Sequence, residues 1–299
     1  MRRYRRGHRA RARVMLFESV PNISDGRDYA IVEACVRAVE SAGARVLHRT
    51  SDPIHNRSVF TIVGEYSTMR DASLALAGAT LERVDLRAHA GVHPRIGSLD
   101  VLPFVPLREA SMDDAVRLAR ETAQAIWERW RVPSFLYGEA AATPLRRNLA
   151  AVRQGQFEGL DARFERPEWK PDFGDVAKHV SAGAIAIGAR ALLVAFNVEL
   201  DTGDLALAKR IARTIRERDG GLRTLKALGL RLSDGLVQVS LNITDFRATP
   251  LYRVVETIRA LAGAHGVGIV RSELIGCIPY EAVEAAADYY LGVDSGGAR

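Results

Sequence analysis

One order of strand-like and helix-like patterns occurs twice along this 299-residue chain, and few folds accommodate such a repeat. A β-α-β-β-α-β order is predicted first from Met15–Val20, Val32–Val39, Arg45–Thr50, Arg57–Gly64, Met69–Val84 and Leu99–Val105. It returns in Ala191–Glu199, Leu205–Arg218, Leu222–Gly229, Leu236–Ile243, Leu251–His265 and Gly268–Ile275. Because split-βαβ units have this order, we expect an α+β chain that contains two of them.

Hydrophobic spacing supports both kinds of element. In the first predicted helix, apolar side chains lie at the i, i+3, i+4 and i+7 positions of one face: Val32, Cys35, Val36 and Val39. In the strand Leu236–Ile243, apolar residues alternate with Gln238, Ser240 and Asn242. Since a split-βαβ sheet carries both helices on one face, this polar row would point either to solvent or into a ligand cleft between the two units.

The region between the two repeats has a different character. Its pattern predicts a helix at Ser111–Trp130, a short strand at Phe135–Tyr137 and a helix at Glu139–Ala151. Residues 155–183 are rich in Gly, Pro and charge and have no hydrophobic period, which is typical of a functional loop or a domain connector. We therefore expect a first subdomain over residues 15–188 and a second over residues 189–299.

The charge of the chain is concentrated at its N-terminus. Residues 1–14 contain seven arginines and no acidic residue, whereas the whole chain carries a net charge of +6, so the rest is nearly neutral. Nucleic-acid binding is therefore expected only of this tail, which could equally be disordered or precede a true start at Met15. Two cysteines, Cys35 and Cys277, and the lack of a long apolar run predict a cytoplasmic protein without a disulfide framework or membrane segment.

The segment Arg87–Asp100 has the composition of a reactive loop, with two histidines, glycines and arginines and no periodicity. His89 and His93 have the spacing of a helical metal pair, but Gly91 and Pro94 argue against a helix, so we expect no metal. His93 is the candidate general acid and base, because imidazole titrates near neutral pH. The alternative is a surface histidine in a turn.

Other catalytic signatures are missing from the sequence. Gly183–Arg190 has the glycine spacing of a phosphate loop but lacks the Lys-Ser/Thr pair that binds a nucleoside triphosphate. We expect its glycines to allow close packing at the entry to the Ala191–Glu199 strand, with Arg190 available for an anionic ligand. Neither a G-x-S-x-G elbow nor a G-x-G-x-x-G fingerprint is present.

Ten segments, in this order and at these intervals, resemble the glutamate formiminotransferase family, which includes the transferase domain of the formiminotransferase-cyclodeaminases. These segments are Val20–Arg27, Asn56–Val59, His89–Gly97, Asp100–Pro106, Phe135–Ala141, Pro167–Gly174, Gly188–Arg190, Ala195–Asn197, Gln238–Ser240 and Ser272–Gly276. The resemblance covers nearly everything from Phe17 onward.

The resemblance implies transfer of the formimino group of N-formimino-L-glutamate to N5 of tetrahydrofolate, a step of histidine degradation and one-carbon metabolism. It also implies two ferredoxin-like subdomains with a folate cleft between them, and a homodimer. The family's catalytic histidine matches His93. Its folate-binding segment matches Gly174, Asp175, Val176, Ala177, Lys178, His179, Val180, Ser181, Ala182 and Gly183.

The sequence departs from the family in two respects. Val92 stands where some relatives have a glutamate beside the catalytic histidine, so Asp52 is the candidate carboxylate that orients His93. The residues after the last matched segment are too few for a cyclodeaminase domain, and we expect the transferase activity alone.

The residue chemistry suits this transfer. Attack by N5 on the amidine carbon gives a tetrahedral intermediate, which collapses only when the attacking nitrogen loses a proton and the departing glutamate nitrogen gains one. One histidine can do both in sequence. Both substrates carry carboxylates, which arginine binds well, so Arg57, Arg95 and Arg190 are the predicted substrate-binding residues unless they form structural ion pairs.

Two alternatives remain at this stage. A formyl group, exchanged between 5-formyltetrahydrofolate and glutamate, differs from formimino by one atom at the reacting carbon. A non-catalytic nucleic-acid-binding module would use the same kind of sheet, but it requires several aromatic residues on its strands. Arg57–Gly64 supplies only one.

Overall fold

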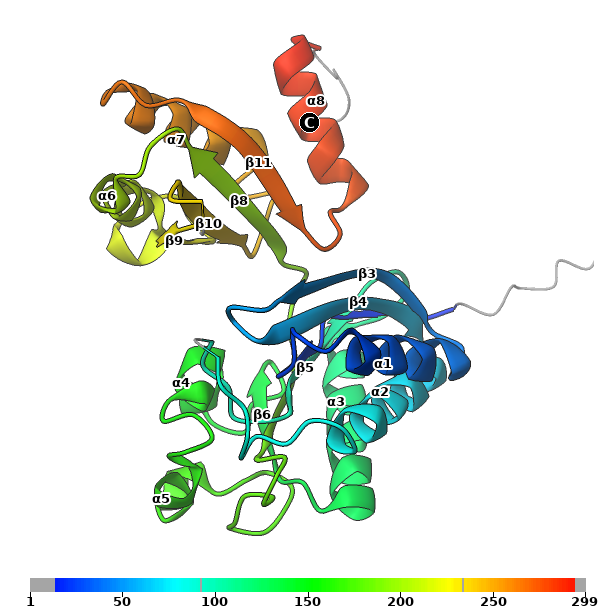
Figure 1. Ribbon diagram of the computed structural model, residues 1–299. Coiled ribbons are helices and arrows are strands. Elements are labelled where there is room, and N and C mark those ends of the chain that lie inside the picture. The colour runs from blue at the N-terminus through cyan, green and yellow to red at the C-terminus, as the bar shows by residue number, and fades with distance from the viewer. Residues whose placement is uncertain (1–13, 92, 233, 294–299) are drawn as a thin grey trace, which may run out of the picture. The chain divides into compact units, whose positions relative to one another are not determined.

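The computed structural model describes residues 14–91, 93–232 and 234–293. The predicted α+β class is confirmed, because the described chain contains two sheets with helices packed on them (Figure 1). The chain divides into two compact units, one that ends at Arg190 and one that begins at Ala191. The expectations for residues 1–13 and for Val92 lie outside the described residues.

The sheet of the first unit has seven strands. They are β1 (Leu16–Ser19), β2 (Asn22–Ile23), β3 (Arg45–Asp52), β4 (Arg57–Glu65), β5 (Leu99–Pro106), β6 (Ser134–Gly138) and β7 (Ile185–Ala189). Strands β5, β1, β4 and β3 lie side by side and antiparallel, and β2 continues the line of β1 between β4 and β5. Beyond β5, strands β7 and β6 extend the sheet with parallel pairing.

Two sequence-based expectations for this part of the chain are corrected by the structure. The segment Gly183–Arg190 was expected to precede a strand, whereas residues 185–189 form β7 in the middle of the extended sheet. The predicted helix Glu139–Ala151 is instead a turn, a 3₁₀ helix (Pro144–Arg146) and the short helix α4 (Leu149–Arg153). Pro144 explains the interruption, because proline cannot donate the backbone hydrogen bond of a helix interior.

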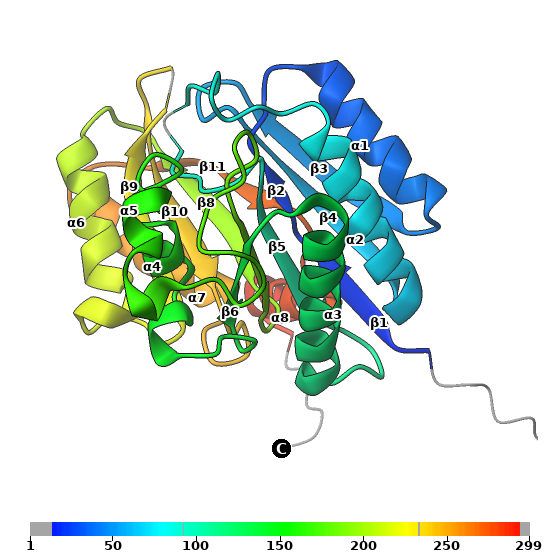
Figure 2. The same cartoon turned by 90° about the horizontal axis from the view of Figure 1, so that it is seen from below.

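Three helices cover one face of this sheet: α1 (Tyr29–Ser41), α2 (Tyr66–Leu81) and α3 (Met112–Trp130) (Figure 2). Phe17, Phe60 and Phe104 are fully buried beneath them and form the centre of the core. Helix α3 begins with a capping box, in which Ser111 and Asp114 each accept a backbone N–H of the other residue. The predicted helical segments of this layer are therefore stabilised by burial of their apolar faces.

The opposite face is covered near β5, β6 and β7 by α4 and α5 (Leu160–Phe164), together with a 3₁₀ helix at Pro167–Trp169. The ring of Phe135 stacks on Phe164 with centroids 5.6 Å apart and meets Trp169 edge-on. The guanidinium of Arg163 donates to the carbonyl oxygens of Ala151, Val152 and Gln154. The glycine-rich stretch 155–183 is thus an ordered cover with its own small core.

The second unit contains β8 (Val194–Leu200), α6 (Leu205–Ile215), a 3₁₀ helix (Glu217–Asp219), β9 (Leu225–Arg231), β10 (Val237–Ile243), α7 (Leu251–Gly263), β11 (Ile269–Ile275) and α8 (Tyr280–Leu291). Its antiparallel sheet has the strand order β11-β8-β10-β9. The second β-α-β-β-α-β order is as predicted, and α8 is an addition. In β10, the apolar residues belong to the core, while Gln238, Ser240 and Asn242 alternate with them on the other face.

Within the described ranges, every helix is too short or too polar to cross a membrane.

Candidate active site

Three loops of the first unit meet beside the ends of β2, β4 and β5. They are the turn after β2, the hairpin between β3 and β4, and the loop from residue 82 to residue 98. The pocket that they form is lined by Ser24, His55, Asn56, Arg57, His89, His93, Arg95 and Asp100. Segments that were singled out from the sequence thus converge on one place.

The hairpin residue Asn56 holds these loops together. Its side-chain oxygen accepts the amide N–H of Gly26 at 3.0 Å, and its side-chain nitrogen donates to the carbonyl oxygen of Ala90 at 3.1 Å. Asn56 itself has a φ of 49°, which asparagine tolerates better than most residues. A side chain at Gly91 would lie 2.6 Å from the carbonyl oxygen of His55, so only glycine allows this approach.

His93 is neutral in this pocket. Its Nε2 atom lies 2.6 Å from Nη1 of Arg57, and since a guanidinium can only donate, Nε2 is the acceptor. Burial, followed by the positive charges of Arg57 and Arg153, lowers the pKa of His93 to about 3. His93 therefore presents an unprotonated nitrogen at neutral pH, as a general base requires.

The expectation that Asp52 orients His93 is wrong, because Asp52 binds another histidine. Its Oδ1 atom accepts the backbone N–H groups of Ile54 and His55 at 2.8 and 2.9 Å, and its Oδ2 atom lies 2.5 Å from Nδ1 of His55. This local turn places the imidazole of His55 against the carboxylate of Asp52. The ring of His55 lies edge-on to that of His93, with centroids 6.2 Å apart.

Sequence reasoning missed His55. The available signal was the spacing Asp52-Pro53-Ile54-His55 at a predicted hairpin turn, where an aspartate readily accepts the amides two and three residues later.

Arg95 and His89 are occupied by neighbouring protein groups. Arg95 donates to both carboxylate oxygens of Glu158 at 2.9 and 2.7 Å, to Gln156 at 3.1 Å, and through Nε to Nδ1 of His89 at 3.1 Å. His89 then has its proton on Nε2, which donates to the carbonyl oxygen of Asn56 at 3.1 Å. Both side chains thus hold the loop in place, although Arg95 was predicted as a substrate ligand.

A buried ion pair between Asp100 and Arg153 lies at the pocket, which Asp100 lines. Asp100 is 2% exposed and accepts the amide of Ile96 at 2.7 Å. It also accepts two N–H groups of Arg153, at 2.8 and 2.5 Å. Arg153, which the sequence did not single out, is the second positive charge that lowers the pKa of His93.

The predicted folate segment, residues 174–183, lies directly beside the histidine loop. The amide of Ser98 donates to the carbonyl oxygen of Ala182 at 3.0 Å, and the amide of Ala184 donates to that of Ile96 at 2.9 Å. Gly97 and Gly183 pair as an antiparallel bridge between them. Any movement of one segment must therefore move the other.

The first part of the segment is exposed, and its later residues are held by contacts. Asp175, Val176 and Ala177 are open to solvent, whereas Lys178 forms an ion pair with Asp161 at 2.9 Å. His179 accepts the amide of Ala182 on Nδ1.

Arg190 follows β7, and its amide pairs with Phe104. It is not among the residues that line the His93 pocket.

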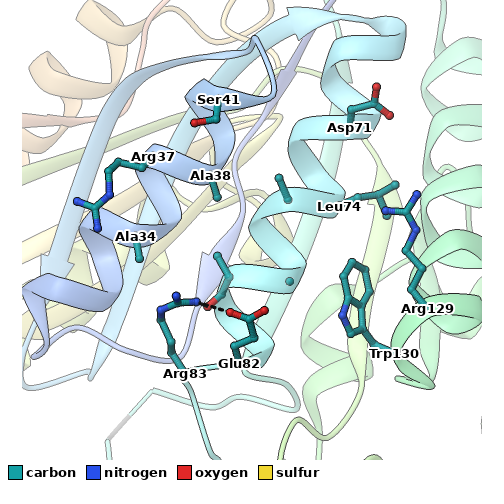
Figure 3. A pocket seen from close by; sticks show the side chains of 13 residues that line it. Ala34, Arg37, Ala38, Ser41, Asp71, Leu74, Glu82, Arg83, Arg129 and Trp130 are labelled. Atoms are coloured by element: carbon teal, nitrogen blue, oxygen red, sulfur yellow. Dashed lines mark hydrogen bonds and ion pairs between the residues drawn. The ribbon is translucent and has the colours of Figure 1, made fainter.

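A second, open pocket lies over α1, α2 and the end of α3 (Figure 3). Small residues form its floor, and Trp130 and the Arg83–Glu82 ion pair, 2.8 Å long, lie at its side. None of the residues that line the histidine pocket contributes to it, so it is not the candidate active site. Among the described residues, no cluster of three or more His, Cys, Asp or Glu side chains could hold a metal ion.

Comparison with known proteins gives the same family along the whole described chain. Residues 16–190 match the formiminotransferase domain, N-terminal subdomain, and residues 195–296 match the formiminotransferase domain. The glutamate formimidoyltransferase of Streptococcus pyogenes is 41% identical over 93% of this chain and 94% of its own length. That of Thermoplasma acidophilum is 44% identical over 94% of this chain and 95% of its own length.

Bifunctional relatives match as well. The formimidoyltransferase-cyclodeaminase of Dictyostelium discoideum is 37% identical over 94% of this chain, and the chain spans 53% of that protein's length. The two domain matches occur in the expected order, and two relatives are more than 40% identical over nearly the full length. These matches identify the family of the chain. This chain belongs to the formiminotransferase family.

Proposed function

We propose that this chain transfers the formimino group of N-formimino-L-glutamate to N5 of tetrahydrofolate, which yields 5-formiminotetrahydrofolate and L-glutamate. The family membership supports the reaction class, and two relatives with this activity in their names match over nearly their whole length. The observation that carries the assignment of the site is the neutral His93, in the same loop as Gly97, which pairs with Gly183 at the end of the predicted folate segment.

In the proposed mechanism, N5 of tetrahydrofolate attacks the amidine carbon of the donor. The new C–N5 bond forms as the C=N double bond becomes single, and Nε2 of His93 takes the proton that N5 must lose. The tetrahedral intermediate then re-forms its C=N bond and expels the glutamate nitrogen, which must gain a proton. Since His93 is held neutral by its surroundings, it can accept the first proton without prior deprotonation.

Arg57 must leave Nε2 of His93 before that nitrogen can act as a base. A substrate carboxylate is a better partner for a guanidinium than an imidazole is, because the carboxylate is charged and accepts two N–H groups. We therefore assign Arg57 to the glutamate donor. Its Nε atom is buried and has no hydrogen-bond partner among the described residues, which leaves a donor for such a ligand.

Other parts of this proposal come from the family. Residues 174–183 are assigned to folate. Arg95 and Arg190 remain predicted substrate ligands, with less support than Arg57. The order β5-β1-β4-β3 in the first unit and β11-β8-β10-β9 in the second supports a ferredoxin-like arrangement of each. A folate site between the units, a homodimer and a cytoplasmic location stay predictions.

The test is an assay of the purified protein with tetrahydrofolate and either N-formimino-L-glutamate or N-formyl-L-glutamate, in which the folate absorbance is followed. We expect turnover with the formimino donor. His93→Ala should lower kcat by about 10²- to 10⁴-fold, the usual contribution of a positioned acid or base, while tetrahydrofolate still binds. Preferential use of the formyl donor would instead establish the formyl-transfer alternative, and full activity of His93→Ala would remove His93 from the mechanism.

A further inference from the structure

Besides His93, the active-site pocket contains His89, whose two ring nitrogens are bound to protein groups, and His55, which the mechanism above does not use. His55 lines the same pocket as His93, and 42% of its side chain is exposed. Its Nδ1 atom is held by the carboxylate of Asp52 at 2.5 Å. Within residues 14–91, 93–232 and 234–293, its Nε2 atom has no hydrogen-bond partner. One nitrogen of this ring is therefore fixed and the other is available to a ligand.

The two histidines have opposite electrostatic surroundings. His93 faces the positive charges of Arg57 and Arg153, and no described carboxylate hydrogen-bonds to it. His55 faces the carboxylate of Asp52, whose Oδ2 atom lies 2.5 Å from its Nδ1 atom. Two imidazoles in one pocket, one against guanidinium groups and the other against a carboxylate, are suited to divide the base and acid roles of a transfer.

The reaction needs both roles at different nitrogens. The attacking N5 must lose a proton, and the departing glutamate nitrogen must gain one before its bond to carbon breaks. His93 is suited to the first task. As a donor it is poorly suited, because its protonated form is destabilised by burial and by both arginines.

We propose that His55, held by Asp52, is a second catalytic residue, which protonates the departing glutamate nitrogen while His93 accepts the proton of N5. This inference rests on the proposed function. The Nε2–H bond of the His55 imidazolium breaks as the N–H bond of glutamate forms, and the electrons of the C–N bond go to that nitrogen. The turnover leaves His93 protonated and His55 neutral.

Proton return completes the cycle without any further reactant. The ring centroids are 6.2 Å apart, so a single solvent molecule can relay the proton from His93 to His55. The proton thereby moves from a site beside two arginines to a site beside a carboxylate. Other charged groups of the pocket are bound elsewhere, since Asp100 is paired with Arg153, and Arg95 with Glu158.

Kinetics of matched variants test the proposal. His55→Gln should lower kcat by about 10²-fold or more and change the KM for tetrahydrofolate little, because a general acid acts on the chemical step. Its pH profile should lose the alkaline limb, which reports an acid that must be protonated. Asp52→Asn should also lower kcat, because it removes the carboxylate that holds Nδ1 of His55. His265→Gln, an exposed histidine after α7, is the control and should behave as wild type.

A structural role for His55 is distinguished by rescue. His55→Ala should regain part of its kcat when imidazole is added, whereas a distorted hairpin would not respond. Unchanged kcat and pH profile in His55→Gln would overturn the proposal, and so would a loss that imidazole does not restore.

A measurement without substrate separates this inference from the proposed function. In the unliganded protein with ¹³C-labelled histidine, His93 should stay unprotonated as the pH falls from 8 to 5, because Arg57 and Arg153 face its ring. Proton uptake by His93 in this range would overturn the division of roles, whatever the activity. If the wild-type protein transfers no formimino group, the proposed function fails, and the titration still decides whether His93 is suited to the role of the base.

Discussion

Replacement of Arg57 by glutamine should raise the pKa of His93. Nη1 of Arg57 lies 2.6 Å from Nε2 of His93 in the structure. Burial, followed by the charges of Arg57 and Arg153, lowers the pKa of this histidine from 6.5 to about 3. Glutamine removes one of the two charges and keeps a side-chain N–H that can still reach the ring.

The size of the effect follows from Coulomb's law. Two unit charges about 4 Å apart interact by about 4 kcal/mol at an effective dielectric constant of about 20, which corresponds to about 3 pH units. Solvent reaches part of the His93 pocket and screens this interaction, and burial is the larger cause of the lowered pKa. The share of Arg57 is therefore about 1 to 2 pH units, and His93 of the variant should titrate at about pH 4 to 5.

The assay is an NMR titration of the imidazole carbons in the unliganded protein, with Arg45→Gln as a control because Arg45 is an exposed arginine of the same hairpin. The activity of Arg57→Gln should fall below about pH 5, since a base that binds a proton is inactive, and its KM for the glutamate donor should rise. A wild-type His93 that titrates near pH 6.5, or the same midpoint in both proteins, would refute the electrostatic reasoning.

Three further predictions concern the framework of the site. Tetrahydrofolate at saturation should slow amide hydrogen exchange in residues 174–183, and equal exchange in both states would remove this segment from the folate site. Asp100→Ala should lower the free energy of unfolding by about 3 to 5 kcal/mol in denaturant titrations, because it leaves the guanidinium of Arg153 buried without its partner; a loss below about 1 kcal/mol would mean that solvent reaches the pair. Gly97→Ala should destabilise the protein by about 1 to 3 kcal/mol, because its Cβ would overlap a facing carbonyl oxygen. Gly263→Ala, at an uncrowded position at the end of α7, should not destabilise it, and equal melting temperatures for the two variants would contradict the steric argument.

The sequence by itself determined the two β-α-β-β-α-β orders, since their elements follow local hydrophobic spacing. Alternation in residues 237–243 and the helical stripe of residues 32–39 each come from a few consecutive positions, and both became the expected elements. His93 could also be predicted, because its loop combines an unusual composition with the absence of periodicity. Local patterns were sufficient wherever the physical cause was itself local.

Tertiary structure decided what depends on distant partners. Strand β7 pairs with β6 and with β5 across more than 40 residues of sequence, so the apolar residues of β6 and β7 alone could not reveal a place in the sheet. Arg95 was predicted as a ligand, but Glu158 satisfies its guanidinium from another loop. The chemical roles of side chains thus depend on which groups the fold brings near them.

His55 and His93 show most clearly what the sequence leaves open and the tertiary structure decides. Both histidines lie in polar segments 38 residues apart, and nothing in the sequence says which charged groups each ring faces. The fold places Arg57 on His93 and leaves Asp52 on His55, in one pocket. Protonation depends on the charges and the burial within a few ångströms of a ring, and only the folded chain sets these.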